Sequence, residues 1–310
     1  MRKLLTITFL ILFVCRVHAQ DSCLPVYNLP VKYMQLSSGK LAYVEKGKGQ
    51  VILFIHGLGG NISHWLKSVN ELSSAYRCIA IDLPGYGWSD KKPDTKGKDQ
   101  LQFYADVVDA FLKKKKIKKL TIAGHSMGAQ LAVISALQNR RVKKIILVAP
   151  AGLETFTEKE AQLLITATPA VVFEKQDETV IRNNFKLNFF QQPSDVETLV
   201  QDRLRMKKCS DFKLYCETVS AGVKGMLAQP VKEKLKNIRI PVLILFGAND
   251  GLIPNKYLHP SLKLAELIKQ SSALIPNCKV EMINDAGHLL QFEKAAATNQ
   301  MIKSFLPYIN

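Results

Sequence analysis

The sequence predicts a doubly wound, mostly parallel α/β sheet that carries a helical insertion. Six short apolar runs each end at a glycine, a proline or a polar residue, which is typical of buried parallel strands. Helical patterns separate most of the runs, and this alternation favours a doubly wound sheet. Residues 152–236 break the alternation, because they contain helical patterns only. The predicted strands are Val51–Ile55, Cys78–Ile81, Leu120–Ala123, Lys144–Ala149, Val242–Phe246 and Lys279–Ile283.

Four helices are predicted between or after these strands, which makes the sheet an open α/β sheet. They are predicted over Ile62–Ala75, Gln100–Lys116, Met127–Asn139 and Phe292–Leu306. In open α/β sheets, ligands bind outside the carboxyl ends of the strands. We therefore expect the functional residues in the loops that follow the strands.

The stretch from residue 152 to residue 236 is rich in apolar residues and contains Phe185, Phe189 and Phe190. An insertion at the strand ends would cover the site as a lid and supply an apolar binding wall. The alternative is a stabilising subdomain that does not contact substrate. The predicted organisation is a signal peptide over residues 1–19, an α/β core over 20–151 and 237–310, and a helical lid over 152–236.

The N-terminus has the pattern of a cleaved secretory signal. A short basic region precedes the apolar run Leu4–Val14, and Val17 and Ala19 occupy the A-x-A-like places before Gln20. Eleven apolar residues are too few to span a bilayer comfortably, since a span takes about 20. We expect a secreted, periplasmic or cell-envelope protein that begins near Gln20. The alternatives are an uncleaved N-terminal anchor and a lipoprotein modified at Cys15.

The chain is strongly basic, with a formal net charge of +17. Removal of Arg2, Lys3 and Arg16 with the signal leaves +14. Such a charge favours electrostatic association with an anionic membrane surface. Much of it lies in Lys113–Lys119, whose other interpretation is a solvated helix end with lysines at the negative pole of the helix dipole. Nothing resembles a nucleic-acid-binding module, so we expect no nucleic-acid partner.

The cysteines do not suggest a disulfide scaffold. Five of the six remain after signal cleavage, so at least one thiol is unpaired. Cys209 and Cys216 lie in a predicted helix, where seven residues separate them by roughly 10 Å, beyond the reach of a disulfide. They can pair only if that helix breaks between them. The fold must therefore rest on its hydrophobic core.

The pentapeptide 124–128, "GHSMG", follows a predicted strand and precedes a predicted helix. A strand, a tight turn and a helix around G-x-S-x-G form the context of a nucleophile elbow. The glycines allow the strained turn and close packing of strand and helix. Ser126 is therefore the predicted nucleophile.

A serine nucleophile needs a base, and the base needs an orienting group. Only His259 and His288 follow Ser126. His288 comes after a strand on a glycine-bearing loop, whereas a structural role suits His259, which precedes a proline in an apolar helical pattern. Asp250 directly follows a strand and is the predicted acid; Asp285 is the rival, although its place suits shaping the loop of His288.

The oxyanion that forms during acyl transfer needs main-chain N–H donors. Met127, the residue after the nucleophile, provides the first. The glycine-rich turn after Val51–Ile55 provides the second, and we select the N–H of Leu58. His56 is expected to hold this turn by hydrogen bonding, and His64 is expected to be a surface or packing residue.

Together these motifs resemble the α/β-hydrolase superfamily, in its lid-bearing branch of esterases and carbon–carbon hydrolases. The resemblance extends from about Gln35 to Leu306 and rests on "HGLGG", "DLPGYGWSD", "GHSMG", "FGANDGLIP" and "AGHLLQFEK". The stretch "ETLVQDRLRMKK" also looks like the lid of hydrolases that cleave ring-fission products, where a lid arginine binds a substrate carboxylate. Arg203 matches that arginine. Two departures from this subgroup are His125, where it carries Asn, and Leu289, where it carries an aromatic residue.

The expected function is hydrolysis of small carboxylic esters by Ser126, His288 and Asp250, with Arg203, Phe185, Phe189 and Leu289 contacting substrate. A serine nucleophile disfavours the aspartate-dependent dehalogenases and epoxide hydrolases of this fold. The sequence contains no HExxH motif or His/Cys cluster, so we expect no metal or organic cofactor. The alternatives are a carbon–carbon hydrolase, against which a secretory signal argues, and a non-enzymatic ligand receptor of the same fold.

Overall fold

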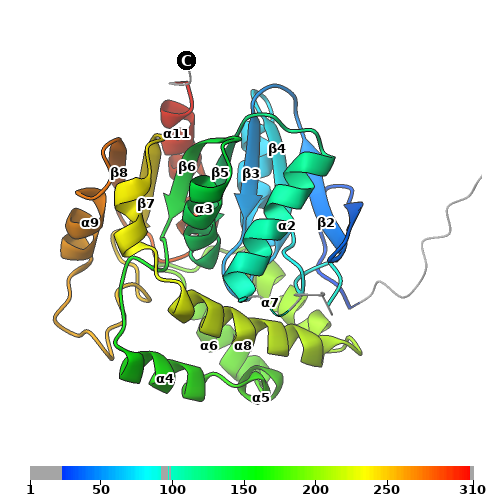
Figure 1. Cartoon of the computed structure of the whole chain (residues 1–310). Helices are drawn as coiled ribbons and strands as arrows, with labels where there is room; N and C mark the ends of the chain where they lie inside the picture. The colour runs from blue at the N-terminus through cyan, green and yellow to red at the C-terminus, as the bar shows by residue number, and fades with distance from the viewer. Residues whose placement is uncertain (1–22, 92–96, 98, 308–310) are drawn as a thin grey trace, which may run out of the picture.

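Within the described residues, an eight-stranded sheet runs through the protein (Figure 1). The computed structural model describes residues 23–91, 97 and 99–307, so the predicted signal peptide lies outside it. The strand order is β1-β2-β4-β3-β5-β6-β7-β8; β3 to β8 are parallel, and β2 is antiparallel to β1 and β4. The strands are β1 Lys32–Leu36, β2 Gly39–Lys46, β3 Val51–Ile55, β4 Arg77–Ile81, β5 Leu120–His125, β6 Val142–Val148, β7 Val242–Gly247 and β8 Cys278–Ile283. The predicted mostly parallel α/β sheet is confirmed.

All six predicted runs form strands, whereas β1 and β2 have no counterpart in the prediction. These two strands form an antiparallel pair at one edge of the sheet. Lys32 and Tyr33 of β1 are exposed, as are Lys40 and Lys46 of β2. Strand β1 is the edge strand and is partly solvated, so it does not read as an apolar run, whereas β2 contains only the four-residue buried run Leu41–Val44 between charged residues.

Helices cover both faces of the sheet. In Figure 1, α2 and α3 lie in front of it and α11 lies behind. Helix α1 packs against α11, and α9 packs against β8. Two predicted helices are interrupted: the first is a 3₁₀ turn followed by α1, and the last is divided into α10 and α11. The bounds are η2 Ile62–Trp65, α1 Leu66–Leu72, α2 Gln100–Lys114, α3 Met127–Gln138, α9 Leu264–Ser272, α10 Leu290–Glu293 and α11 Ala295–Phe305.

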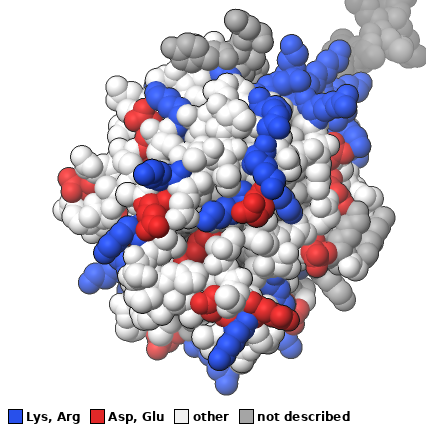
Figure 2. Space-filling view, turned by 60° about the vertical axis from the view of Figure 1, so that its left-hand side comes forward, with Lys and Arg blue, Asp and Glu red and all other residues white. Residues whose placement is uncertain are grey.

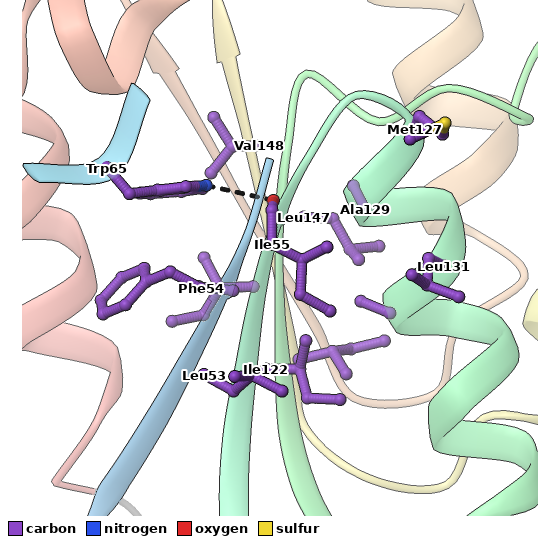
Figure 3. Packing of buried hydrophobic residues seen from close by; sticks show 14 of the residues in the cluster. Leu53, Phe54, Ile55, Trp65, Ile122, Met127, Ala129, Leu131, Leu147 and Val148 are labelled. Atoms are coloured by element: carbon purple, nitrogen blue, oxygen red, sulfur yellow. Dashed lines mark hydrogen bonds between the residues drawn. The ribbon is translucent and has the colours of Figure 1, made fainter. Parts of the chain in front are cut away.

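Apolar side chains of the central strands fill the space between the sheet and its helices (Figure 3). Phe54, Ile122 and Leu131 are fully buried. Full burial of such a side chain contributes about 1.5–3 kcal/mol. The Trp65 indole N–H donates to the carbonyl of Ile55 at 3.0 Å (Figure 3). This bond holds η2 against the end of β3, where the glycine-rich turn begins.

Five helices and a 3₁₀ helix lie between β6 and β7. They are α4 Glu158–Ala167, α5 Ala170–Glu174, α6 Glu178–Lys186, α7 Val196–Met206, α8 Phe212–Ala228 and η3 Lys232–Asn237. Figure 1 shows the α-helices of this insertion gathered below the sheet. Helices α4 and α5 bury no residue, whereas α8 buries many, including Tyr215, Val219 and Gly222. Helix α8 therefore joins the insertion to the core.

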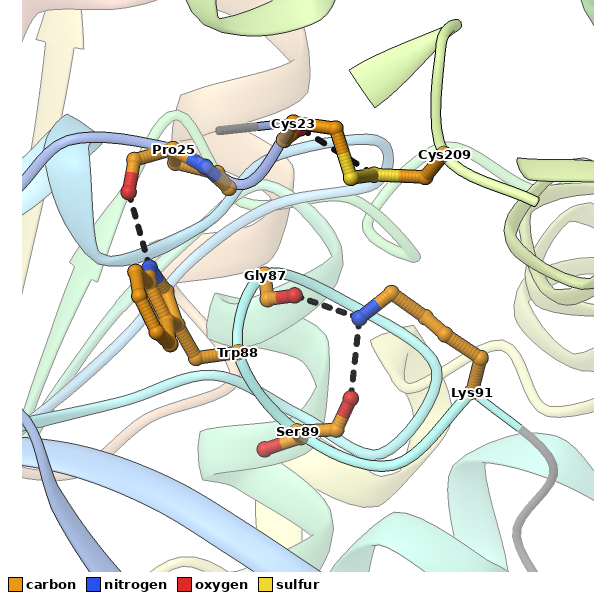
Figure 4. The surroundings of a disulfide bond; sticks show 7 residues. All are labelled: Cys23, Pro25, Gly87, Trp88, Ser89, Lys91 and Cys209. Carbon is orange, nitrogen blue, oxygen red and sulfur yellow. Dashed lines mark hydrogen bonds between the residues drawn. A yellow bond between two sulfur atoms is a disulfide. The ribbon is translucent and has the colours of Figure 1, made fainter. Parts of the chain in front are cut away.

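A disulfide bond joins Cys23 to Cys209 (Figure 4). Helix α7 ends at Met206, so the helix predicted through Cys209 and Cys216 is interrupted. Cys209 pairs with Cys23 rather than with Cys216, which is buried with a free thiol. The bond ties the first described residue to the corner between α7 and α8.

The lysine run 113–119 begins in the last turn of α2 and continues into the loop before β5. Lys113 forms an ion pair with Asp109 at 2.5 Å, and Lys115 forms one with Glu45 at 2.8 Å. Part of the run is therefore neutralised by acidic neighbours. In residues 23–307, apart from the undescribed 92–96 and 98, no helix is long and apolar enough to cross a membrane.

Candidate active site

Ser126 occupies a strained turn between β5 and α3. Its φ of 52° lies in the region that residues with a Cβ rarely adopt. Its N–H donates to the Val148 carbonyl at 2.9 Å, and its carbonyl accepts from the N–H groups of Ala129 and Gln130 at 2.9 and 3.1 Å. The turn places Ser126 at the N-terminus of α3, where the helix dipole stabilises negative charge.

The two glycines of the pentapeptide are required by close backbone contacts. A Cβ on Gly124 would lie 2.1 Å from the Gly128 carbonyl oxygen, and a Cβ on Gly128 would lie 2.4 Å from the Ile55 carbonyl oxygen. Neither neighbour can give way, because both are main-chain atoms. The local sequence is therefore fixed by the packing of α3 against β3 and β5.

Asp250 and His288 form a buried hydrogen-bonded pair. His288 Nδ1 lies 2.9 Å from Asp250 Oδ2, and both residues are buried. The other carboxylate oxygen, Oδ1, accepts from the main-chain N–H groups of Leu252 and Ile253 at 2.8 and 3.0 Å. With Nδ1 donating to the carboxylate, Nε2 is left as the basic nitrogen of the imidazole.

The rival residues have other partners. His259 Nδ1 lies 2.5 Å from Glu154 Oε1, and its ring stacks on Phe156. It lies in a series of turns, so the helical pattern read there is wrong. Asp285 has a φ of 51° and makes no hydrogen bond to His288. Its left-handed backbone shapes the loop that carries His288.

Leu58 and Met127 lie on two turns that approach each other. A Cβ on Gly57 would lie 3.1 Å from the Ser126 Cβ, so the turn after β3 contacts the nucleophile. Among the described residues, neither the Leu58 nor the Met127 N–H has a hydrogen-bond acceptor. The His56 ring spans the turn: Nδ1 lies 2.8 Å from the Gly57 carbonyl, and Nε2 accepts from the N–H of Leu83 at 3.1 Å.

His125 forms a hydrogen bond with the loop that carries His288. Its Nε2 lies 3.0 Å from the main-chain carbonyl of His288, to which it must donate. Burial lowers the pKa of His125 well below that of a free histidine, and it lowers the pKa of His56 to about 4. Both rings are therefore neutral at pH 7. His125 joins the serine turn directly to the loop of His288.

A cavity of about 170 Å³ lies beside these turns, between core and insertion. Leu58 and Leu289 line it from the core, and Phe185, Ile181 and Arg203 line it from the insertion. Three of the four predicted substrate contacts, Arg203, Phe185 and Leu289, therefore meet in one cavity. A larger groove of about 660 Å³ borders Asp250 but not Leu58, so it opens away from the turn selected for the oxyanion.

Phe189, the fourth predicted contact, lies elsewhere. Its side chain is buried against Leu199, Leu289 and Phe292, and it is absent from the lining of the 170 Å³ cavity. Phe189 therefore supports Leu289 from behind. The apolar pattern identified the residue as buried but did not distinguish a cavity wall from the packing behind it.

Two site residues were not selected from the sequence. His64 is half-buried and lines the cavity, and its burial lowers its pKa to about 3. Tyr215 of α8 donates from its hydroxyl to the Gly59 carbonyl at 3.0 Å. Neither belongs to a motif, although His64 lies close after "HGLGG" in the chain.

The chain matches a known family model over most of these strands and helices. The family model for the alpha/beta hydrolase fold matches residues 50–295, which is most of the chain. The chain belongs to the α/β-hydrolase family. The match includes Ser126, Asp250 and His288 within its bounds, and the prediction of an enzyme of this family is confirmed.

This α/β hydrolase has relatives of several activities. It is 28% identical over 275 residues to the dihydrolipoyllysine-residue acetyltransferase component of the acetoin cleaving system of Cupriavidus necator, covering 86% of this chain and 66% of the relative. It thus spans just under two thirds of that relative. It is 27% identical over 281 residues to a 2-hydroxy-6-oxononadienedioate/2-hydroxy-6-oxononatrienedioate hydrolase of Pseudomonas putida, covering 87% and 92%.

Solved structures agree on the fold. A probable hydrolytic enzyme from Pseudomonas aeruginosa superposes with a TM-score of 0.81 at 24% identity, covering 91% of this chain and 96% of the other. A thermophilic esterase from Thermogutta terrifontis gives a TM-score of 0.72 at 20% identity, covering 90% and 98%.

Proposed function

We propose that this α/β hydrolase cleaves small carboxylic esters through an acyl-enzyme. The observation that carries the proposal is the buried Asp250–His288 pair, joined through His125 to a serine held at φ 52°. A base oriented by a carboxylate is what a serine hydroxyl needs in order to attack a carbonyl. The unpartnered N–H groups of Leu58 and Met127 are suited to stabilise the oxyanion.

The reaction proceeds in two halves. His288 Nε2 takes the hydroxyl proton while Ser126 Oγ bonds to the ester carbonyl carbon, and the two N–H groups bind the oxyanion. The imidazolium then gives this proton to the leaving alkoxide as the ester C–O bond breaks. In the second half, water attacks the acyl-enzyme, with His288 again as base, and the acid leaves as Ser126 regains its proton.

A fluorophosphonate probe tests the nucleophile directly. We expect stoichiometric labelling, with the modified peptide containing residue 126, and loss of p-nitrophenyl ester hydrolysis in proportion to labelling. Pretreatment with a short ester substrate should slow the labelling. Absence of labelling in the folded protein would instead favour a ligand receptor that has the fold without the reaction.

A carbon–carbon hydrolase is the second candidate, favoured by one observation. Arg203 lines the cavity and has no carboxylate partner among the described residues. A guanidinium is suited to bind a carboxylate, and the Pseudomonas putida relative is named as a hydrolase of two dicarboxylates, 2-hydroxy-6-oxononadienedioate and 2-hydroxy-6-oxononatrienedioate. Comparing kcat/KM for a short p-nitrophenyl ester and for a ring-fission product decides between the candidates; a higher value for the ester supports the first.

We propose that residues 152–236 act as a lid. The loop of His288 contacts this insertion, because the Leu289 N–H donates to the Asn188 carbonyl at 2.9 Å. Phe185 is the apolar wall that it contributes to the cavity. Replacing Phe185 with Ala should therefore shift the preferred acyl chain to greater length. An unchanged chain-length profile would contradict the assignment.

We propose that the protein is secreted or retained in the periplasm or cell envelope, with its signal removed after Ala19. The Cys23–Cys209 bond supports this location, because disulfides persist in oxidising compartments. N-terminal sequencing of the protein from its producing cells should begin at Gln20. Recovery of Met1 would indicate a retained anchor, and a lipid-modified Cys15 would indicate a lipoprotein.

We also propose that the basic surface binds anionic membranes electrostatically. Figure 2 shows lysines and arginines gathered on part of one face. Lys116, Lys118 and Lys119 are exposed, and none has an acidic partner among the described residues. We expect co-sedimentation with vesicles containing phosphatidylglycerol at low salt, and loss at high salt, because screening weakens such contacts.

Two controls define that expectation. Vesicles of phosphatidylcholine alone should not bind, and a variant with Lys116→Glu, Lys118→Glu and Lys119→Glu should bind the anionic vesicles about a hundredfold more weakly, on the order of three lost headgroup contacts at about 1 kcal/mol each. Equal binding of wild type and variant would make the three lysines part of a solvated segment after α2 only.

A further inference from the structure

Two side chains of the insertion share one acceptor in the turn that follows β3. The Arg203 guanidinium, through Nη2, and the Tyr215 hydroxyl both donate to the main-chain carbonyl of Gly59. The Arg203 Cζ lies 5.0 Å from the centroid of the Tyr215 ring, so the two side chains also stack as a cation–π pair. Helices α7 and α8 are thereby joined to the turn that contains Leu58.

The backbone of Gly59 is shaped for this contact. Its φ of 68° lies in the left-handed region, which glycine adopts at no steric cost. A Cβ there would lie 3.5 Å from both Arg203 Nη2 and Tyr215 Oη. These are ordinary van der Waals distances, so the position favours glycine because of its φ, and the left-handed turn presents the carbonyl to the insertion.

The peptide bond between Gly57 and Leu58 is fixed by different donors. The carbonyl of Gly57 accepts from the Gly60 N–H at 3.1 Å and lies 2.8 Å from His56 Nδ1. In a trans peptide the C=O and the following N–H point in opposite directions. The N–H of Leu58 therefore points away from these donors. His56 orients the first peptide of the turn, and Arg203 with Tyr215 holds its far end.

Helix α8 also contacts the side chains of both oxyanion candidates. A Cβ on Gly222 would lie 2.6 Å from Leu58 Cδ1 and 3.5 Å from Met127 Sδ. The same helix thus carries Tyr215, which holds the Gly59 carbonyl, and Gly222, which seats Leu58 and Met127.

We infer that Arg203 and Tyr215 are positioning residues for the oxyanion hole. The inference rests on the proposed ester hydrolysis by Ser126. Oxyanion donors are effective because they are aligned before the charge develops, and the shared Gly59 carbonyl is the point where the insertion sets that alignment. Arg203 therefore acts through the turn, in addition to lining the cavity, and its effect extends to substrates without a carboxylate.

The test uses three variants of the full chain and a neutral p-nitrophenyl ester. Tyr215→Phe removes only the hydroxyl donor and should lower kcat about fivefold, the equivalent of one neutral hydrogen bond. Arg203→Met should lower kcat about tenfold or more, because its bond is charge-assisted. KM should change less than twofold in both. Arg203→Lys keeps the charge and should recover part of the loss.

A second readout separates positioning from general damage to the fold. An alkyl trifluoromethyl ketone traps Ser126 as a hemiketal whose oxyanion occupies the hole, so its Ki should rise by the factor by which kcat/KM falls. Tyr43→Phe is the matched control: its buried hydroxyl, on β2, accepts a hydrogen bond from Lys115 Nζ at 3.2 Å and contacts no residue of the turn. It should leave kcat and Ki unchanged.

Three results would overturn the inference. Unchanged kcat and Ki in Tyr215→Phe and Arg203→Met, with an inactive Ser126→Ala, would remove the positioning role and leave the proposed function standing. A loss confined to KM for carboxylate-bearing esters would make Arg203 a substrate anchor alone. A wild-type protein that neither hydrolyses esters nor binds the ketone would remove the proposed function, and the inference with it.

Discussion

Replacing Ser126 with alanine is expected to lower kcat/KM for a p-nitrophenyl ester by about 10⁴-fold to 10⁶-fold. Loss of the nucleophile in a serine triad has effects of that order, and what remains comes from the oxyanion hole and substrate binding. The fold should persist, because alanine keeps the Cβ at φ 52° and the serine side chain has no hydrogen bond to lose among the described residues. Steady-state kinetics and a thermal melt, shifted by less than about 2 °C, check both statements.

Ser135→Ala is the matched control for this variant. Ser135 is buried on α3, the helix that Ser126 precedes, and its hydroxyl has no hydrogen-bond partner in the described part of the chain. It should retain wild-type activity and fluorophosphonate labelling. Turnover by Ser126→Ala within tenfold of wild type would exclude Ser126 as the nucleophile.

Replacing Asp250 with asparagine is expected to lower kcat at neutral pH by about 10⁴-fold with little change in KM, as loss of the triad carboxylate does elsewhere. The two oxygens of Asp250 have different partners here. Oδ1 accepts from the N–H groups of Leu252 and Ile253, whereas Oδ2 accepts from His288. In the variant, these main-chain donors keep the amide oxygen and turn the NH₂ group toward His288. The imidazole must then accept at Nδ1, which puts its proton on Nε2 and removes the base.

Asp285→Asn tests the rival acid. Asparagine tolerates the left-handed backbone at this position, where φ is 51°. This variant should keep kcat within about twofold of wild type, as surface changes usually do. A larger loss in Asp285→Asn than in Asp250→Asn would reverse the assignment of the acid.

The central parallel strands β3 to β7 could be predicted because they are buried on both faces and therefore contain continuous apolar runs, whereas β8 lies at the edge and is only partly buried. Val242–Gly247 is buried throughout, and so is Leu120–His125. The antiparallel pair β1 and β2 lies at the edge; β1 is mostly exposed, and β2 has a short apolar run, Leu41–Val44, between Lys40 and Glu45. Helix α9 also has no counterpart among the predicted helices. The Cys23–Cys209 bond joins residues 186 positions apart, a pairing that depends on the tertiary fold and not on spacing.

The site also contains residues that the sequence could predict and residues that depend on tertiary packing. Ser126, Asp250 and His288 follow strands that end at one edge of the sheet, so chain order and strand ends were enough to select them as candidates. Tyr215 and the orientation of Arg203 depend on how α7 and α8 pack on the turn after β3. No pattern in the chain encodes that approach. In the sequence His125 stands out only as a departure from one subgroup of the family, whereas in the structure its ring bonds to the main-chain carbonyl of His288.

The segment that begins at Cys23 bonds both to the core and to the part of the insertion around α7. Cys23 is bonded to Cys209, the Val26 N–H donates to Asp202 of α7 at 3.1 Å, and the Pro25 carbonyl accepts from the Trp88 indole of the core at 2.7 Å (Figure 4). These bonds tie α7 and the corner between α7 and α8 to the core, whereas no residue of α4 or α5 is fully buried. The N-terminal segment therefore helps to hold the two donors of the Gly59 carbonyl, Arg203 and Tyr215, through bonds that lie outside their own helices.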